Sequence, residues 1–163
     1  MIFVTVGTQF AFDRLVKAID DFVSYNGFKQ EVFAQIGNSS YKPRSFEYVK
    51  SLNKSGFDYT MKKASSIISH AGMGTITTAL DNHKPLLVMP RIRKYGEVVN
   101  NHQVAIARNF EKLGCILVAY ETEELPVKIE ELKTFVPRKR EAQTQMVAER
   151  IARFLSKLAN NGK

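Results

Sequence analysis

The sequence predicts an α/β protein whose single domain is built on a doubly wound parallel sheet. Short apolar, β-rich runs alternate with segments of helical periodicity along nearly all of the 163 residues. Glycine-containing or polar turns follow several of these runs, at the carboxyl ends of strands where ligands bind in such folds. A chain of this length suffices for one domain with a sizeable core, and we find no internal repeat or linker.

The first quarter of the chain predicts a strand, a helix and a second strand. Residues 1–6 are rich in β-branched and aromatic side chains. They lack a basic flank and a cleavage-like region, so we expect a strand here and not a signal peptide. Apolar residues recur at helical spacing over 12–23, with Asn26-Gly27 as a stop signal. Residues 31–36 predict the next strand, which ends at Gly37 and three polar residues.

The middle of the chain continues the alternation. Residues 45–50 predict a short strand, and residues 57–64 predict a helix with weaker periodicity. A fourth strand over 65–69 leads through a glycine-rich turn to a helix over 75–82. Residues 86–89 predict a fifth strand, which Pro90 closes because proline cannot donate to a ladder.

The last third predicts two helices and one strand. Residues 100–113 have helical spacing with Gly114 at their end, and residues 116–119 form an apolar run. Residues 121–133 are acidic and only loosely patterned. A long helix is expected over 141–158, within a basic amphipathic segment (140–160) of a domain that we expect to span residues 1–163.

The formal net charge of +8 is unevenly distributed. Residues 137–163 hold seven basic side chains against two glutamates. Such a basic tail indicates binding to an anionic surface, which could be lipid headgroups, nucleic acid or an acidic partner. The alternative is that the tail is a solvated helix face. The sequence contains no recognition-helix or RNP-like motif and no interleaved aromatic residues for stacking, which disfavours nucleic acid. No apolar run approaches the roughly 20 residues that a membrane span needs.

The single cysteine, Cys115, lies in an apolar run, so we expect a small buried hydrophobic residue. Without a disulfide framework the composition favours a reducing compartment.

Residues 69–75 combine a strand end, two glycines and a helix start. His70 ends the apolar run, Gly72 and Gly74 flank the turn, and Thr75 opens the helix. Glycine lets backbone approach a ligand closely, and a helix N-terminus attracts anions, so this turn predicts a phosphate site. The glycine turn alone is weak support, since such turns join many strands to helices.

A second polar cluster, Asn101-His102-Gln103, follows one βα unit later and could lie beside the first at the same sheet edge. Between the two clusters, Arg91, Arg93 and Lys94 could neutralise phosphate, lie along a lipid surface or form a solvated loop.

The ordered set of motifs resembles the donor-nucleotide half of GT-B glycosyltransferases, above all glycosyltransferase family 28. The matching residues are His70–Thr75, Lys84-Pro85, Pro90 and Asn101–Gln103, together with the V-T-V-G-T string at 4–8. The resemblance covers nearly the whole chain. It is greatest to small one-domain members: the eukaryotic soluble subunit of the dolichol-linked N-acetylglucosamine transferase, and bacterial PssE-like capsule and exopolysaccharide proteins. It implies a Rossmann-like domain.

The resemblance also implies a nucleotide-sugar site. Backbone groups around Gly72–Thr75 would hold the diphosphate, and His70, if protonated, would add a charge-assisted hydrogen bond. Many relatives carry a ribose-binding glutamate eight residues after the histidine, where this chain has Thr78. The expected nucleotide-sugar-binding residues are Gly7, Thr8, His70, Ala71, Gly72, Met73, Gly74, Thr75, Asn101, His102 and Gln103.

From the same resemblance we expect the donor-binding subunit of a two-component inverting glycosyltransferase. It would use a UDP-sugar, without metal or cofactor, and transfer a hexose or hexuronic acid to a lipid-linked sugar acceptor in exopolysaccharide or capsule synthesis. A membrane-anchored acceptor-binding partner would supply the base, because 163 residues are too few for both halves. The subunit would be cytoplasmic and recruited to the membrane face, with the C-terminal helix as the docking element. The alternative is a nonenzymatic accessory protein that stabilises or activates a partner transferase.

Overall fold

The computed structural model describes residues 1–25 and 27–138. This part of the chain forms one six-stranded sheet in which every pairing is parallel, in the order β3-β2-β1-β4-β5-β6. The doubly wound α/β fold is therefore confirmed. The strands are β1 (Ile2–Thr5), β2 (Val32–Gln35), β3 (Glu47–Val49), β4 (Ser66–His70), β5 (Leu86–Met89) and β6 (Leu117–Val118).

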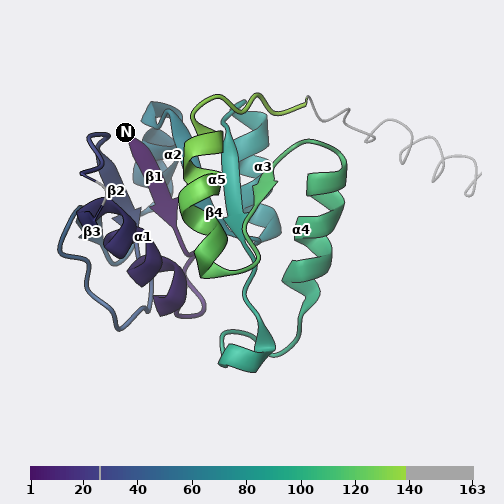
Figure 1. Cartoon of the computed structure of the whole chain (residues 1–163), viewed down its shortest axis with the longest axis horizontal. Coiled ribbons are helices and arrows are strands. Elements are labelled where there is room, and N and C mark those ends of the chain that lie inside the picture. Colours follow the sequence, from purple (N-terminus) through teal and green to yellow (C-terminus); the bar gives the residue numbers. More distant parts are fainter. Residues whose placement is uncertain (26, 139–163) are drawn as a thin grey trace, which may run out of the picture.

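Helices cover both faces of the sheet (Figure 1). The α-helices are α1 (Asp13–Tyr25), α2 (Lys54–Lys63), α3 (Met73–Asp81), α4 (His102–Lys112) and α5 (Leu125–Leu132), and the short 3-10 helices are η1 (Arg93–Tyr95) and η2 (Thr122–Glu124). Buried side chains of α1 and α5 pack on one face with Val4 and Leu87. Those of α2, α3 and α4 pack on the other face with Phe3 and Val88. Alternate residues of one strand thus feed two separate cores, because successive side chains point to opposite faces.

The strand order reverses direction between β1 and β4, and this reversal positions the site. The register pairs Thr5 with Ser69, so the chain leaves β1 toward Gly7 beside His70, the last residue of β4. In open parallel sheets, loops diverge above such a reversal and leave a crevice.

Three features differ from the expectations. α2 begins at Lys54, three residues early, because the Asn53 side chain accepts a hydrogen bond from Gly56 N at 2.8 Å and caps the helix. Residues 121–133 contain η2 and α5, which begin with a capping box at Glu121 and Glu124. The 93–95 segment forms η1, which no pattern predicted. Residue 26 and the expected helix at 141–158 lie outside the described residues.

Lys84 binds the last carbonyls of α2. Its Nζ donates to the carbonyls of Lys62 and Ala64, at 2.6 and 2.7 Å, and so closes the C-terminal end of α2. A cation at a helix C-terminus is favourable because carbonyls there lack intrahelical partners. Cys115 is buried, as expected, with its Sγ 3.8 Å from the Leu113 carbonyl.

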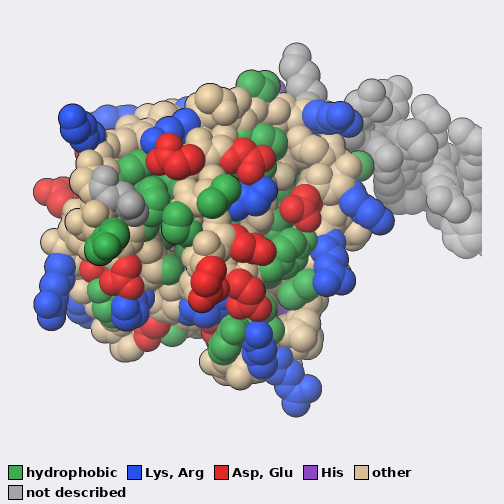
Figure 2. Space-filling model, viewed as in Figure 1, with side chains coloured by type: hydrophobic (Ala, Val, Ile, Leu, Met, Phe, Trp, Pro, Cys, Tyr) green, Lys and Arg blue, Asp and Glu red, His purple; other side chains and the backbone are tan. Residues whose placement is uncertain are grey.

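The surface of the described residues is mixed in charge. On the face that Figure 2 shows, acidic side chains gather over α5 and η2, and Lys and Arg lie mostly nearer the edges. The exposed acidic residues of these elements are Glu123, Glu124, Glu130 and Glu131. Six of the 24 basic and two of the 16 acidic residues lie beyond 138, so the described part carries a net +4. Among its helices, none has the length and apolar character to cross a bilayer.

Candidate functional site

A cavity of about 290 Å³ opens at the carboxyl ends of β1, β4 and β5. It lies where the strand order reverses, which is the ligand-binding position of open α/β sheets. Seven of the predicted site residues line it: Gly7, Thr8, His70, Gly72, Thr75, His102 and Gln103. The remaining walls come from Val6, Gln9, Phe10, Arg91 and Val98. The two polar clusters, about 30 residues apart in sequence, thus share one cavity.

The His70 ring is fixed between two glycines. A β-carbon on Gly7 would lie 2.9 Å from His70 Cε1, and one on Gly72 would overlap Nε2. Gly7 also has a φ of +74°, which L side chains rarely adopt. Both glycines are therefore required by the packing of the imidazole, and Gly7 is also required by its backbone conformation.

His70 is neutral at physiological pH. Burial, and then the positive charge of Arg91, lower its pKa from 6.5 to about 4, while the backbone of Thr5 acts in the opposite direction. Its Nδ1 is buried and has no hydrogen-bond partner among the described residues. The expected charge-assisted bond requires a protonated His70, and burial beside a cation disfavours the imidazolium in the protein without ligand. A neutral imidazole remains able to donate one hydrogen bond to a ligand.

The N-terminus of α3 faces the cavity without a side-chain cap. Gly72 is the N-cap residue, and no side chain accepts from the first turn. The backbone N–H groups of Met73, Gly74 and Thr75 therefore lack intrahelical partners and suit an anion. A β-carbon on Gly74 would meet no protein atom within 4 Å. Thr75 is buried and lines the cavity.

Four of the predicted residues do not line the cavity. Ala71 is fully buried in the core beneath α3, and Met73 is exposed at the start of that helix. Gly74 is exposed beside it. Asn101 accepts a hydrogen bond from Arg93 N at 2.8 Å and so holds the 90–97 loop.

Three other polar residues already have partners within the protein. The Thr78 hydroxyl donates to the Gly74 carbonyl at 2.7 Å and is not part of the cavity wall. The Gln103 side chain accepts from Arg91 N at 3.1 Å, although the residue lines the cavity. His102 contacts Asn100 through its Nδ1 and remains exposed at the mouth.

Of the three basic residues that the sequence grouped together, Arg91, Arg93 and Lys94, Arg91 is the one that lines the cavity. Its side chain is buried, and its Nη2 donates to the carbonyls of Val6 and Phe10 at 2.6 Å each. Its guanidinium lies 4.9 Å from the centre of the Phe12 ring. Burial lowers the pKa of Arg91 to about 10, and Glu97 opposes this shift, so the group stays charged at pH 7.

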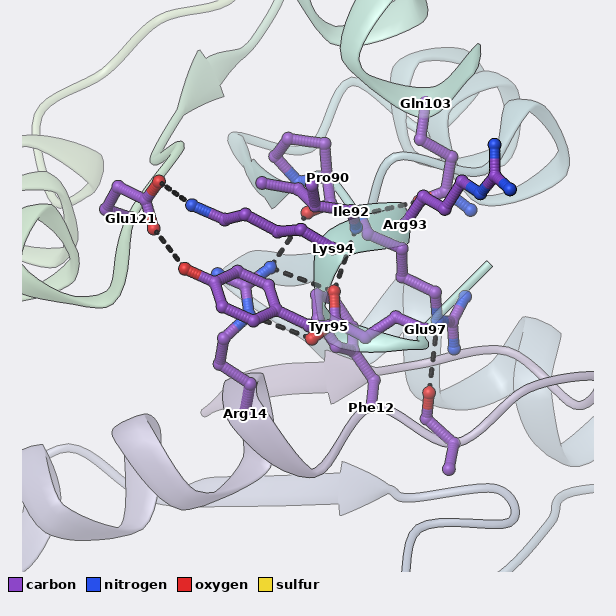
Figure 3. Close-up of polar contacts among 12 residues, drawn as sticks. Phe12, Arg14, Pro90, Ile92, Arg93, Lys94, Tyr95, Glu97, Gln103 and Glu121 are labelled. Atoms are coloured by element: carbon purple, nitrogen blue, oxygen red, sulfur yellow. Dashed lines mark hydrogen bonds and ion pairs between the residues drawn. The ribbon is translucent and has the colours of Figure 1, made fainter. Parts of the chain in front are cut away.

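A second arginine ties the same loops together (Figure 3). Arg14 of α1 makes two bonds to Glu97, at 2.8 and 3.0 Å, and donates to the Pro90 carbonyl at 3.1 Å. Glu97 also accepts from Ile92 N at 2.9 Å. The Tyr95 ring lies 4.7 Å from Arg14 Cζ. These contacts hold the 90–97 loop, whose Arg91 lines the cavity, against α1.

No group of three His, Cys, Asp or Glu residues suited to a metal ion occurs in the part of the chain that the structure describes.

Solved glycosyltransferase structures share this fold. The chain matches the rice protein Os79 in complex with U2F and trichothecene, with a TM-score of 0.61 and 17% identity, over 82% of this chain and 32% of that chain. It also matches a solution NMR structure of ALG13, with a TM-score of 0.59 and 19% identity, over 90% of this chain and 93% of that chain.

Curated relatives point the same way. Human ALG13, named as a UDP-N-acetylglucosamine transferase subunit, is 30% identical over 127 residues, which cover 69% of this chain and 10% of the relative. The subunit of the same name from Candida albicans is 36% identical over 89 residues, 54% of this chain and 27% of the relative. The chain therefore spans between a tenth and about a quarter of these relatives.

The family model for the glycosyltransferase family 28 C-terminal domain matches residues 1–161. With a parallel sheet of the Rossmann-like kind, and a glycine-bounded cavity where its strand order reverses, the chain belongs to that glycosyltransferase family.

Proposed function

We propose that this chain is the donor-binding subunit of a two-component glycosyltransferase, and that its cavity holds the nucleotide diphosphate of a UDP-sugar. The observation that carries the proposal is the uncapped N-terminus of α3, which faces a cavity at the strand-order reversal. A helix N-terminus with free N–H groups favours a diphosphate. Family membership adds that the domain type is found in glycosyltransferases.

The reaction that fits is direct displacement. A base of the partner takes the proton of the acceptor hydroxyl, whose oxygen then bonds to the anomeric carbon. The bond from that carbon to the diphosphate breaks, and UDP leaves with the electron pair. This chain would stabilise the departing diphosphate through the first-turn N–H groups of α3. As in the inverting GT-B enzymes that the sequence resembles, we propose that no bound metal is needed.

The partner and the setting belong to the same proposal. We propose a membrane-anchored acceptor-binding subunit, a lipid-linked saccharide acceptor and a cytoplasmic location at the membrane face. The relatives' name makes UDP-N-acetylglucosamine the first donor to test. Transfer of a hexose or hexuronic acid in exopolysaccharide or capsule synthesis stays a prediction from sequence, and UDP-hexoses and UDP-hexuronic acids belong in the same assay.

Calorimetric titration of the chain with UDP and UDP-sugars tests the site. Because His70 is neutral, His70→Asn should weaken UDP binding by about 0.5–1.5 kcal/mol, the range for an uncharged hydrogen bond. His83→Asn, at the other end of α3 and away from the cavity, is the matched control and should bind as wild type. Equal affinity in the His70 and His83 variants would reject the site.

The same titration separates the runner-up. A nonenzymatic accessory protein would not need to bind nucleotide. Wild-type protein that binds none of the UDP-sugars would therefore favour the accessory function. Transfer activity separates the two-component model. The chain alone should give no product from a UDP-sugar and a lipid-linked acceptor, and product should form once the acceptor-binding subunit is added. Efficient transfer by the chain alone contradicts this model.

A further inference from the structure

The guanidinium of Arg91 is held by backbone carbonyls. Only 2% of the residue is exposed, yet it carries a full positive charge. Three carbonyls of the loop after β1 accept from it: Val6 and Phe10 at 2.6 Å each, and Ala11 at 3.3 Å. Carbonyl dipoles satisfy N–H donors, but they do not neutralise a buried cation.

No carboxylate in the described residues forms an ion pair with Arg91. Glu97 is the acidic group whose charge acts on the Arg91 pKa, and both oxygens of that carboxylate already bind Arg14. One Glu97 oxygen also accepts from Ile92 N. Among the described residues, the Arg91 charge is therefore left without a direct counter-charge.

Arg91 nevertheless borders open space. It lines the cavity together with His70, Gly72 and Thr75. Its Nη1 donates no hydrogen bond to any described residue, and that atom is not among the buried groups left without a partner. A neutral His70 supplies no charge, so Arg91 is the formal cation that this wall of the cavity presents.

We propose that Arg91 binds the diphosphate of the ligand directly and supplies the formal positive charge of the site. The inference rests on the proposed function and adds to it the residue that selects an anionic ligand. The competing explanation is that Arg91 only positions the 6–11 loop, which its carbonyl contacts also support. The two roles differ in how a lysine and an uncharged ligand behave.

The test compares UDP, uridine and inorganic pyrophosphate on wild-type protein and three variants, by NMR titration of the full chain. The variants are Arg91→Met, Arg91→Lys and the control Arg93→Met, which removes an exposed arginine of the same loop. Arg91→Met should lower the ratio of UDP to uridine affinity by about tenfold or more, as expected for a hydrogen bond between charged groups. Arg91→Lys should keep most of the ratio, and Arg93→Met should change it less than about twofold.

Each outcome decides one point. A purely positioning role predicts that Arg91→Lys fails as badly as Arg91→Met, with uridine and UDP weakened in parallel. An unchanged affinity ratio in Arg91→Met overturns the inference and leaves the proposed function standing. Wild-type protein that binds neither UDP nor pyrophosphate overturns the proposed function itself.

A measurement on the wild type covers the case in which Arg91→Met does not fold. The side-chain Nε–H resonance of Arg91 should shift on addition of pyrophosphate and UDP, but not with uridine. A resonance that pyrophosphate leaves in place contradicts direct binding.

Discussion

Gly7 and His70 lie so close that a β-carbon on the glycine would come within 2.9 Å of the imidazole Cε1. The ring has no room to retreat, because Gly72 borders it on the other side. The parallel pairing of Thr5 with Ser69 sets this proximity, because strands β1 and β4 end at nearly the same level of the sheet. This wall of the cavity is therefore built by the contact of two loops that are more than 60 residues apart in sequence.

Gly7→Ala should destabilise the protein by about 2–4 kcal/mol, because it combines a positive φ with overpacking against His70. Gly96→Ala is the matched control. Its φ of +71° is nearly that of Gly7 (+74°), but a β-carbon there meets nothing within 4 Å. That control should lose only about 1 kcal/mol. Urea unfolding measures both, and equal losses would show that the His70 contact is not tight.

Gly74→Ala should stabilise the fold and weaken ligand binding. The new methyl group meets no protein atom, and alanine gains roughly 0.5–1 kcal/mol over glycine inside a helix. The same methyl would crowd a diphosphate at the first turn of α3. Thermal unfolding of the variant measures the gain in stability, and UDP titration of the same sample measures the loss of affinity. A variant that binds UDP as tightly as wild type would remove the α3 N-terminus from the site.

Stability should fall as pH drops from about 6.5 toward 4. Above pH 6.5 His70 is neutral in both states and contributes nothing to this change. Below it the unfolded chain takes up a proton that the folded protein, with a His70 pKa of about 4, resists. The loss approaches about 3 kcal/mol by linkage, since one pKa unit is worth roughly 1.4 kcal/mol.

His70→Asn checks that loss, because it should flatten this part of the profile. Asp13 and Asp20 have carboxyl pKa values that folding lowers. Their contribution to stability is therefore lost only below the unfolded pKa of 3.8. Chemical unfolding at a series of pH values measures the profile. Identical wild-type and variant slopes between pH 6.5 and 4 would show that His70 is not the group responsible.

Glu97→Ala should lower the free energy of unfolding by about 3 kcal/mol or more, because it leaves the Arg14 guanidinium without its ion-pair partner and the Ile92 N–H without its acceptor. Only 8% of the Glu97 side chain and 16% of the Arg14 side chain are exposed. Asp21→Ala breaks the exposed pair with Lys17, at about 60% exposure, and should cost below about 0.5 kcal/mol. Adding Arg14→Met to Glu97→Ala should restore part of the loss. Purely additive losses would rule out coupling between the two side chains.

Thr78→Glu should strengthen UDP binding up to about tenfold, by adding the carboxylate that the resemblance to family 28 implies for the ribose hydroxyls. The present threonine uses its hydroxyl on the Gly74 carbonyl. Uridine should gain as much as UDP, since the new contact is to the sugar. Thr77→Glu, one position along, points elsewhere on the helix and serves as the control. Equal gains in both variants would assign the effect to helix charge.

The order of elements and the edge of the sheet that carries the site were predictable from sequence, because both depend on local periodicity. His70 and the glycines were found because a strand end, a turn and a helix start lie within six residues. Arg91 was not distinguished from Arg93 and Lys94, since all three are basic residues of one short loop. Its burial depends on carbonyls about 80 residues earlier, which no local pattern reveals.

The missed helix α5 did leave a signal. Leu125, Ile129 and Leu132 fall at helical spacing and are buried, and Pro126 stands at the helix start. The acidic residues between them obscured the apolar stripe. The neutral state of His70 was also beyond the sequence, because it depends on burial and on Arg91, which folding brings near.

The burial of Cys115 makes the protein suitable for site-selective labelling. It is the single cysteine of the chain, and only 3% of it is exposed. A cysteine introduced at Gly74, where no protein atom stands in the way, would react with a fluorescent maleimide while Cys115 stays shielded. The dye would sit on the first turn of α3 and report in real time the arrival of a nucleotide or of a second protein.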